Sequence, residues 1–156
     1  MEKKFAEFFA GFAQESPMFH YLDEKDTRIL SRYLEFRQLK RGEVLFREGD
    51  PGEYVIFILK GSIEVTTTSS EGEPFTLAQL GWGTSVGEMA VIDELPRSAA
   101  AFVVDDAEFF ILSRSSFNEI LEKHYKLGVR LLKGIAWTMS LRLRYNSRRL
   151  IDHVQI

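Results

Sequence analysis

The chain has 156 residues, the length of one typical domain and enough to bury a hydrophobic core. It contains no cysteine, which excludes a disulfide framework, a thiolate metal site and a cysteine nucleophile. Its net charge of −3 gives the surface no general attraction for nucleic acid, and no apolar stretch approaches the ~18 residues of a membrane span. We therefore expect a soluble, cytoplasmic protein with a single domain over residues 1–156.

Residues 1–38 predict two N-terminal helices. The first covers residues 3–14, where phenylalanines recur at helical spacing and are expected to pack into the core: Phe5, Phe8, Phe9 and Phe12. The second begins at a cap, Asp23 or Asp26, and runs through Arg37.

Residues 39–113 have a different texture. Short runs rich in Val, Ile, Phe and Thr alternate with glycine-containing turns, of which EGDPG is the clearest. The runs EYVIFILK, SIEVTTTS, SAAAFVV and AEFFILS are each expected to form a separate strand. About eight short strands at this spacing predict an antiparallel β-roll or jelly roll, so the fold class is mainly β with flanking helices (α+β).

Residues 114–156 predict helices again. Ser116 and Glu119 form a candidate capping box for a short helix, and a longer helix follows from Lys126 to Asp152. Along it, steps of four and three give a heptad seam: Leu132, Ala136, Met139, Leu143, Asn146 and Leu150. The seam predicts a homodimer through the C-terminal helix, with its asparagine fixing the register.

The stretch VGEMAVIDELPRSA (residues 86–99) places Glu88 and Arg97 in an apolar part of the chain. A buried ion costs several kcal/mol unless it is paired, so one interpretation is a structural ion pair between these two residues. The flanking residues favour a ligand. Gly87 precedes a possible one-turn helix, where glycine allows close approach and free N–H groups suit an anion.

Further residues of the stretch fit an anionic ligand. The fork of Arg97 suits phosphate oxygens, Ser98 adds a hydroxyl, and Ala99 adds a backbone N–H with no bulk over it. Glu88 is an acceptor for sugar hydroxyls. The residues alone predict a small anionic ligand such as a nucleotide, without specifying which.

The same stretch resembles the phosphate-binding cassette of the cyclic-nucleotide-binding domain family, shared by catabolite-activator-type regulators, cyclic-nucleotide-dependent kinases and gated channels. KRGEVLFREGDPGEYVIFILKGSIEV (residues 40–65) resembles the first half of that domain. With LSRSSFNEIL and SLRLRYNSRRL, the resemblance covers most of the chain from about Pro17. It implies a β-roll with a short helix in the cassette and a long C-terminal helix that moves when ligand arrives.

The resemblance also implies roles for single residues. Glu88 would accept from the ribose 2′-OH, and Arg97 would pair with the cyclic phosphate, helped by Ser98 and Ala99. Backbone contacts near the sugar-phosphate would come from Gly87 and Ala90. The predicted ligand-binding set is Val86, Gly87, Glu88, Met89, Ala90, Arg97, Ser98 and Ala99, with Val86 standing where the family usually has an aromatic residue.

Two residues of the last helix are weaker candidates. Asn146 and Ser147 lie where family members place base-contacting polar groups, but positions in the seam or on the surface explain them equally well. The same helix is basic, through Arg142, Arg144, Arg148 and Arg149. A solvated face beside a dimer seam explains these arginines better than nucleic-acid contact.

Enzyme and metal chemistry find little support in the sequence. The histidines His20, His124 and His153 are dispersed, whereas a metal-dependent jelly roll needs clustered ligands. No serine lies in a nucleophile elbow, and GWGTSVG lacks the features of a P-loop. We expect no enzyme activity, no metal and no cofactor.

The predicted function is a stand-alone regulatory module that binds cAMP in preference to cGMP. Ligand binding would shift the C-terminal helix and change its contacts with a second subunit or a protein effector. One alternative is a degenerate module of the same fold that acts in protein–protein interaction without nucleotide. A second is a DNA-binding regulator that uses the basic C-terminal helix, and no helix-turn-helix motif supports it.

Overall fold

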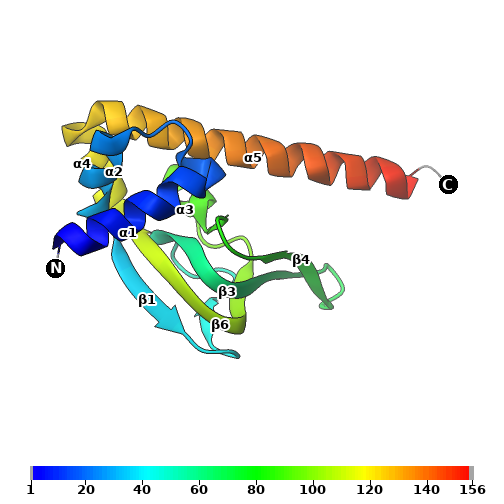
Figure 1. Ribbon diagram of the computed structural model, residues 1–156. Coiled ribbons are helices and arrows are strands. Elements are labelled where there is room, and N and C mark those ends of the chain that lie inside the picture. The colour runs from blue at the N-terminus through cyan, green and yellow to red at the C-terminus, as the bar shows by residue number, and fades with distance from the viewer. Residues whose placement is uncertain (1, 155–156) are drawn as a thin grey trace.

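The computed structural model describes the backbone of residues 2–154 and the side chains of residues 3–152. Figure 1 shows the larger helices grouped on one side of a β-roll, with the C-terminal end of α5 extending past it. In chain order the elements are α1 (Glu2–Glu15), η1 (Pro17–Phe19), α2 (Glu24–Ser31), β1 (Glu35–Leu39), β2 (Val44–Phe46), β3 (Tyr54–Thr68), β4 (Pro74–Leu80), β5 (Ser85–Val86), α3 (Glu88–Asp93), β6 (Ala100–Ser113), α4 (Arg114–Lys123) and α5 (Tyr125–Val154).

The strands form one antiparallel sheet. Its main path is β1-β6-β3-β4, while β2 also pairs with β6 and β5 with β3. Within residues 2–154 there are six strands rather than the predicted eight or so, because β3 and β6 each contain two of the predicted runs. At the predicted break, Gly61 adopts φ +81°, and a Cβ there would overlap the carbonyl oxygen of Asp106. This glycine therefore bends β3 against β6 without ending it.

The second predicted helix is shorter than its sequence pattern indicates. Asp23 is its N-cap: its carboxylate accepts from the N–H of Asp26 at 2.8 Å, and the Asp26 carboxylate accepts from the N–H of Asp23 at 3.0 Å. The helix ends at Ser31, and residues 35–39 form β1 instead of continuing to Arg37. Pairing of this segment with β6 overrides its local helical propensity.

The phenylalanine face of α1 packs into the core, as predicted, and the structure places it against β6. Phe9 is fully buried, and its ring meets that of Phe110 edge to face with centroids 5.3 Å apart. Phe8 is half exposed at the border of this core. A second apolar cluster fills the roll itself, with Ile56, Ile58 and other β3 and β6 side chains inside it.

The C-terminal helices begin differently from the prediction. Ser113 is the N-cap of α4, and its hydroxyl accepts from the N–H of Ser116 at 3.0 Å, so the predicted cap at Ser116 is wrong. The long helix α5 is confirmed within the described residues, whereas residues 155–156 of the predicted helical region lie outside them. None of the described helices has the length and apolar character needed to cross a membrane.

Helix α5 is anchored by its first half. Leu127, Leu131 and Ile135 are buried against the helical layer, and a Cβ on Gly134 would overlap the carbonyl oxygen of Met18 in η1. The predicted seam lies on a different face: Leu132 and Met139 are half-buried, and its other members are exposed. Every described side chain after Arg142, through residue 152, is exposed. The distal part of the helix is therefore free of packing against the rest of the described chain.

Candidate functional site

The local backbone around α3 requires a glycine at its start. Val86 in β5 pairs with Ile56, and Gly87 then serves as the N-cap of α3 with φ +88°. A Cβ at position 87 would overlap Nη1 of Arg97 and lie 3.1 Å from the carbonyl oxygen of Tyr54. Glycine is thus needed both for the left-handed backbone and for the close approach of the arginine.

Arg97 lies beneath this turn and is only 5% exposed. Its Nη2 donates to the carbonyl oxygen of Tyr54 at 2.6 Å, and its Nη1 donates to that of Gly87 at 3.1 Å. The guanidinium carbon lies 4.1 Å from the ring centroid of Phe46 and 4.8 Å from that of Tyr54. Two aromatic faces and two carbonyls therefore fix the orientation of the cation.

The structure gives this cation no direct counter-ion within the described residues. Among the described side chains, none forms an ion pair with Arg97, and its buried Nε has no hydrogen-bond partner. Burial lowers the pKa of Arg97, and the nearby carboxylates of Glu88 and Asp50 partly oppose that effect. A buried guanidinium in this state gains from an anion that supplies the missing charge and acceptors.

The loop between β2 and β3 holds the backbone on either side of the site. The N–H of Arg97 donates to the carbonyl oxygen of Asp50, and the N–H of Gly49 donates to that of Arg97, both at 2.8 Å. A Cβ on Gly52 would overlap the Cβ of Ala90 in α3. The EGDPG loop predicted from the sequence thus packs against α3 and fixes the segment between α3 and β6 that carries the arginine.

Glu88 is buried at 4% exposure and faces the C-terminal helix. It accepts from the hydroxyl of Ser85 at 3.2 Å and forms an ion pair with Nη1 of Arg142 in α5. Nη2 of Arg142 donates to the carbonyl oxygen of Ser85 at 2.7 Å. The ion pair between Glu88 and Arg97 that was one interpretation of the sequence is therefore wrong, since each has other partners.

The structure brings most of the predicted site residues together. Val86, Ala90 and Ala99 are buried around the α3 turn, whereas Met89 and Ser98 are exposed. The two weaker candidates on α5, Asn146 and Ser147, are not brought to this cluster by any described hydrogen bond. They are exposed on the distal helix beyond Arg142.

Sequence reasoning missed several residues that shape the site. Phe46 and Tyr54 reach Arg97 from strands far along the chain, and no local pattern identifies them. Burial raises the pKa of Tyr54, and its neutral hydroxyl donates to the carbonyl oxygen of Leu45 at 3.0 Å. Arg142 could have been found from the sequence. It follows the buried Ile135 by seven residues, so it lies on the same face of α5, where a charged side chain needs a partner.

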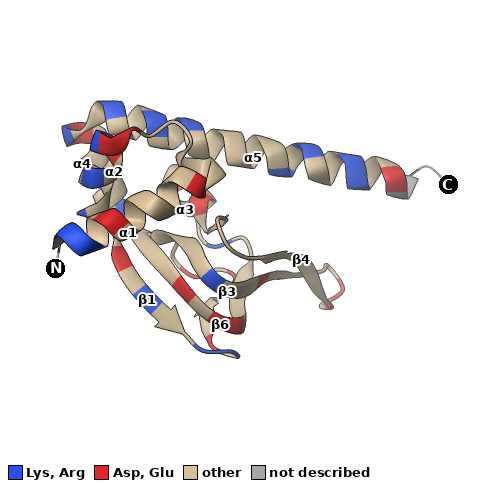
Figure 2. Ribbon diagram, viewed as in Figure 1, with Lys and Arg blue, Asp and Glu red and all other residues tan. Residues whose placement is uncertain are grey.

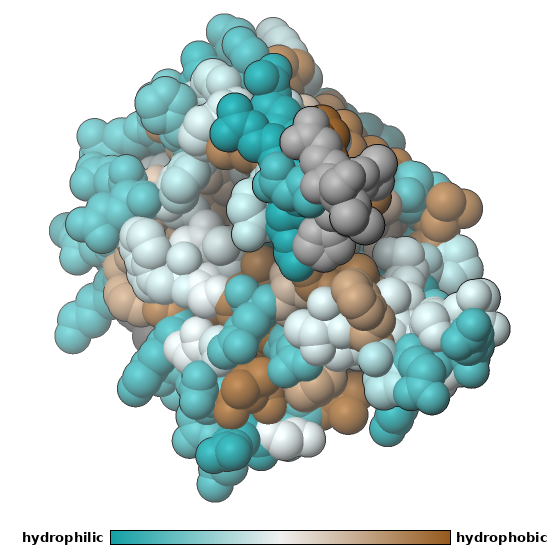
Figure 3. All heavy atoms as spheres, turned by 90° about the vertical axis from the view of Figure 1, so that its right-hand side faces the viewer, coloured by the Kyte–Doolittle hydropathy of each residue, from teal (hydrophilic) through white to brown (hydrophobic). Residues whose placement is uncertain are grey.

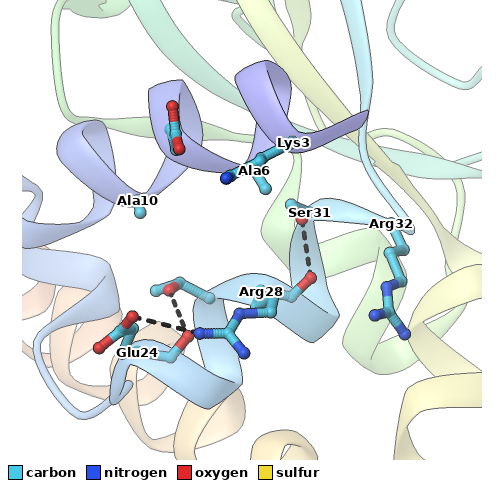
Figure 4. A pocket seen from close by; sticks show the side chains of 9 residues that line it. Lys3, Ala6, Ala10, Glu24, Arg28, Ser31 and Arg32 are labelled. Atoms are coloured by element: carbon cyan, nitrogen blue, oxygen red, sulfur yellow. Dashed lines mark hydrogen bonds and ion pairs between the residues drawn. The ribbon is translucent and has the colours of Figure 1, made fainter. Parts of the chain in front are cut away.

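A separate surface cavity of about 510 Å³ lies between α1 and α2 (Figure 4). Ala6 and Ala10 form one wall of it. On the other wall, the hydroxyls of Thr27 and Ser31 donate to carbonyls of their own helix, and Arg28 pairs with Glu24. Its two hydroxyls already have partners, and its charged side chains are exposed and mixed in sign, so we assign it no ligand.

Comparisons with known proteins agree on one family. A model of the cyclic nucleotide-binding domain matches residues 36–124. The cyclic AMP receptor protein of Thermus thermophilus is 32% identical over 108 residues, which cover 69% of this chain and 50% of that protein. The structure of a cyclic nucleotide-binding domain from Methylobacillus flagellatus KT has a TM-score of 0.86 at 29% identity, covering 96% of this chain and 84% of that one.

A third relative shows that the same domain also occurs as a small part of a much longer protein. The lysophospholipase nte1 of Neurospora crassa is 31% identical over 106 residues, which are 68% of this chain but 7% of that protein. The chain thus spans half or less of the length of these two curated relatives. The residues that match the family model contain the whole of 86–99 and end before α5, so Arg142 lies outside them.

Proposed function

The chain belongs to the cyclic nucleotide-binding domain family, and on that premise we propose that it binds a 3′,5′-cyclic purine nucleotide at residues 86–99. The observation that carries this proposal is the buried guanidinium of Arg97, held by carbonyls and aromatic rings with no carboxylate partner among the described side chains. A cyclic phosphate supplies one negative charge and oxygen acceptors for it.

The proposed phosphate subsite lies at the α3 turn. Arg97 pairs with the phosphate, and the exposed hydroxyl of Ser98 and the backbone N–H of Ala99 are further donors. Gly87 at the start of α3 would give the ligand close access to the backbone, because glycine carries no side chain. Val86 and Ala90, both buried, fix the backbone from below, and the exposed Met89 is left at the rim.

The proposed ribose subsite is the carboxylate of Glu88, which would accept a hydrogen bond from the 2′-OH. We favour cAMP over cGMP, an expectation that the likeness to a protein named for cyclic AMP supports. Binding involves no chemistry and no cofactor, because the ligand itself carries the signal. The expectation of a cytoplasmic location belongs to the same proposal.

We also propose that α5 passes the signal to a second copy of the chain. Its seam residues Leu143 and Leu150 are 69% and 67% exposed, although leucine is usually buried. Figure 3 views the molecule from the side toward which α5 extends, and hydrophobic side chains reach the surface there among hydrophilic ones. If a homodimer covers this seam, the dimer contacts depend on the position of α5. A shift of α5 on ligand binding would then change those contacts. A protein effector is the other partner that such a surface can serve.

The alternatives fit the site less well. A degenerate module would have no need to bury an arginine without a counter-ion, since an apolar residue of similar volume is more stable there. A DNA-binding regulator would use the basic residues spaced along α5 (Figure 2). One of them, Arg142, is already paired with Glu88, and acidic side chains elsewhere give the chain its net charge of −3.

Calorimetric titration with cAMP, cGMP and 5′-AMP tests the proposal. The protein is first unfolded and refolded so that no nucleotide is carried over from purification. We expect micromolar or tighter binding of a cyclic nucleotide and much weaker binding of 5′-AMP. Absence of heat and of thermal stabilisation with all three would contradict the proposal and favour the degenerate module. A DNA affinity that falls steeply with salt would favour the DNA-binding alternative.

A further inference from the structure

The carboxylate proposed to hold the ribose already has a charged partner within the chain. Arg142 joins Glu88 across 54 sequence positions, and its second nitrogen bonds the carbonyl oxygen of Ser85. The Glu88 side chain is 5% exposed and the Arg142 side chain 32% exposed. The contact is therefore largely removed from water. Salt screens an ion pair in such a place much less than a fully exposed one.

A ribose hydroxyl can reach this carboxylate only if a group that covers it moves away, because the Glu88 side chain is 5% exposed while Arg142 is in place. Ser85 and Arg142 supply the hydrogen bonds that Glu88 accepts among the described residues, and Ser85 is fixed next to the site in β5. Arg142 is the partner that can leave, because it is borne by a separate helix. A hydroxyl does not replace the charge of the guanidinium, so displacing Arg142 opposes ligand binding.

The same contact ties α5 to the roll. The proximal half of the helix has other anchors: buried Leu131 and Ile135, and Arg130, which bonds Asp23 at 3.0 Å and Asp26 at 2.6 Å. Among described hydrogen bonds, those from α5 to the roll all come from Arg142. Loss of this contact would therefore release the distal part of α5 while the proximal part stays in place.

Resting on the proposed function, we propose that Arg142 is an internal competitor of the nucleotide for Glu88. Arg142 and the ribose 2′-OH bind the same carboxylate in exclusion of one another. The ion pair lowers nucleotide affinity in the resting protein, and nucleotide binding frees the distal part of α5. A ligand can shift α5 only if it binds more tightly when the helix is in one position than in the other. Competition with Arg142 would supply this difference.

The competition is tested with Arg142→Ala and with the matched control Arg144→Ala, which removes an exposed arginine from the same helix. Each variant and the wild type are titrated with cAMP and with 2′-deoxy-cAMP. We expect Arg142→Ala to bind cAMP more tightly by about 5-fold to 150-fold, the usual range of a coupling between two sites. The 2′-deoxy ligand has no 2′-hydroxyl and so does not compete with Arg142 for Glu88. We expect the substitution to change its affinity much less. Arg144→Ala should match the wild type.

A measurement on protein with Arg142 intact guards against a variant that folds poorly. The chain has no cysteine, so spin labels can be attached at Glu71→Cys in the β3–β4 turn and Arg148→Cys in distal α5. Labelled chains are diluted with unlabelled ones to suppress distances between subunits. We expect cAMP to shift or broaden this distance, and to leave unchanged the distance from Glu71→Cys to Lys126→Cys at the proximal end.

The outcomes separate the two levels of the proposal. Tighter binding by Arg142→Ala, or binding by that variant alone, supports the competition. Binding of cAMP by the wild type with equal or weaker binding by Arg142→Ala overturns the competition and leaves the proposed function standing. An unchanged distal distance on saturation with cAMP also overturns it. Absence of binding by both proteins overturns the proposed function and the competition with it.

Discussion

Gly87 and Arg97 fit each other so closely that neither position can change alone. Nη1 of Arg97 donates to the carbonyl oxygen of Gly87 at 3.1 Å, and a Cβ at position 87 would overlap that same nitrogen. Gly87 also has a φ of +88°, which a residue with a side chain adopts only with strain. The turn that begins α3 is thus also the wall that orients the buried cation.

Gly87→Ala should therefore damage the ligand site more than the fold. We expect it to displace the guanidinium and weaken cyclic-nucleotide binding by about 30-fold or more, the lower end of the effect of losing a buried charge partner. Gly42→Ala is the matched control, because Gly42 has the same φ of +88° with nothing within 4 Å of an added Cβ. Both variants should lose about 1–3 kcal/mol of stability through backbone strain. Equal nucleotide affinities for the two, measured by calorimetry, would refute the role of Gly87.

Gly134→Ala should loosen α5 from η1. Alanine is the better helix former by about 1 kcal/mol, but its Cβ would overlap the carbonyl oxygen of Met18, and overpacking of this kind costs about 1–3 kcal/mol. Gly11→Ala in α1 places its Cβ in open space and should stabilise the protein. Urea unfolding measures both free energies. A Gly134→Ala protein as stable as Gly11→Ala would show that α5 does not pack on η1 as described.

Asp23 should give the fold a dependence on acid. The hydrogen bond from the N–H of Asp26 lowers the pKa of Asp23 below its ordinary value of 3.8, and Arg130 adds to this effect. A carboxyl whose pKa is lower in the folded state stabilises the fold above its unfolded pKa and loses that contribution as pH falls through the folded pKa. Asp23→Asn keeps a capping side chain without the charge. We expect its thermal midpoint to lie below that of the wild type at pH 7 and to approach it below pH 3.8. A difference that stays constant down to pH 2 would contradict this origin.

The proposed dimer depends on the seam of α5. Leu143→Glu places a charge in that seam, whereas Leu141→Glu changes an equally apolar, exposed residue on another face of the same helix. We expect Leu143→Glu to dissociate the dimer and Leu141→Glu to leave it intact, as measured by sedimentation over a range of concentrations. A wild-type protein that is monomeric at all concentrations, or identical behaviour of both variants, would exclude this interface.

Local patterns predicted those features of the fold that local physics determines. The phenylalanine face of α1, the long α5 and the cassette helix all follow from helical spacing or from a glycine before a short apolar run. The predicted number of strands and the predicted end of α2 were wrong because both depend on pairing with β6. It pairs with residues 35–39 and accommodates the bend at Gly61, and such long-range pairing leaves no mark in a short window.

The candidate site divides in the same way. Gly87, Glu88 and Arg97 were identifiable because charges in an apolar run demand partners. The partners of these residues could not be identified from the sequence. Arg97 contacts the carbonyl of Tyr54, 43 positions away, and Glu88 contacts Arg142, 54 positions away. The sequence pattern also favoured the exposed seam of α5 over the face that is buried. Burial of that face depends on where η1 and α2 lie, which is a property of the assembled fold.

The role of Arg97 is tested most directly by the affinity of Arg97→Ala for a cyclic nucleotide, measured by calorimetry beside the wild type. Arg47→Ala, which removes an exposed arginine from the neighbouring loop, is the control, and circular dichroism verifies that both variants are folded. We predict that Arg97→Ala loses about 2–5 kcal/mol of binding free energy, roughly 30-fold to a few thousand-fold in affinity, while Arg47→Ala binds like the wild type. A folded Arg97→Ala protein that binds the nucleotide as tightly as the wild type would contradict the account.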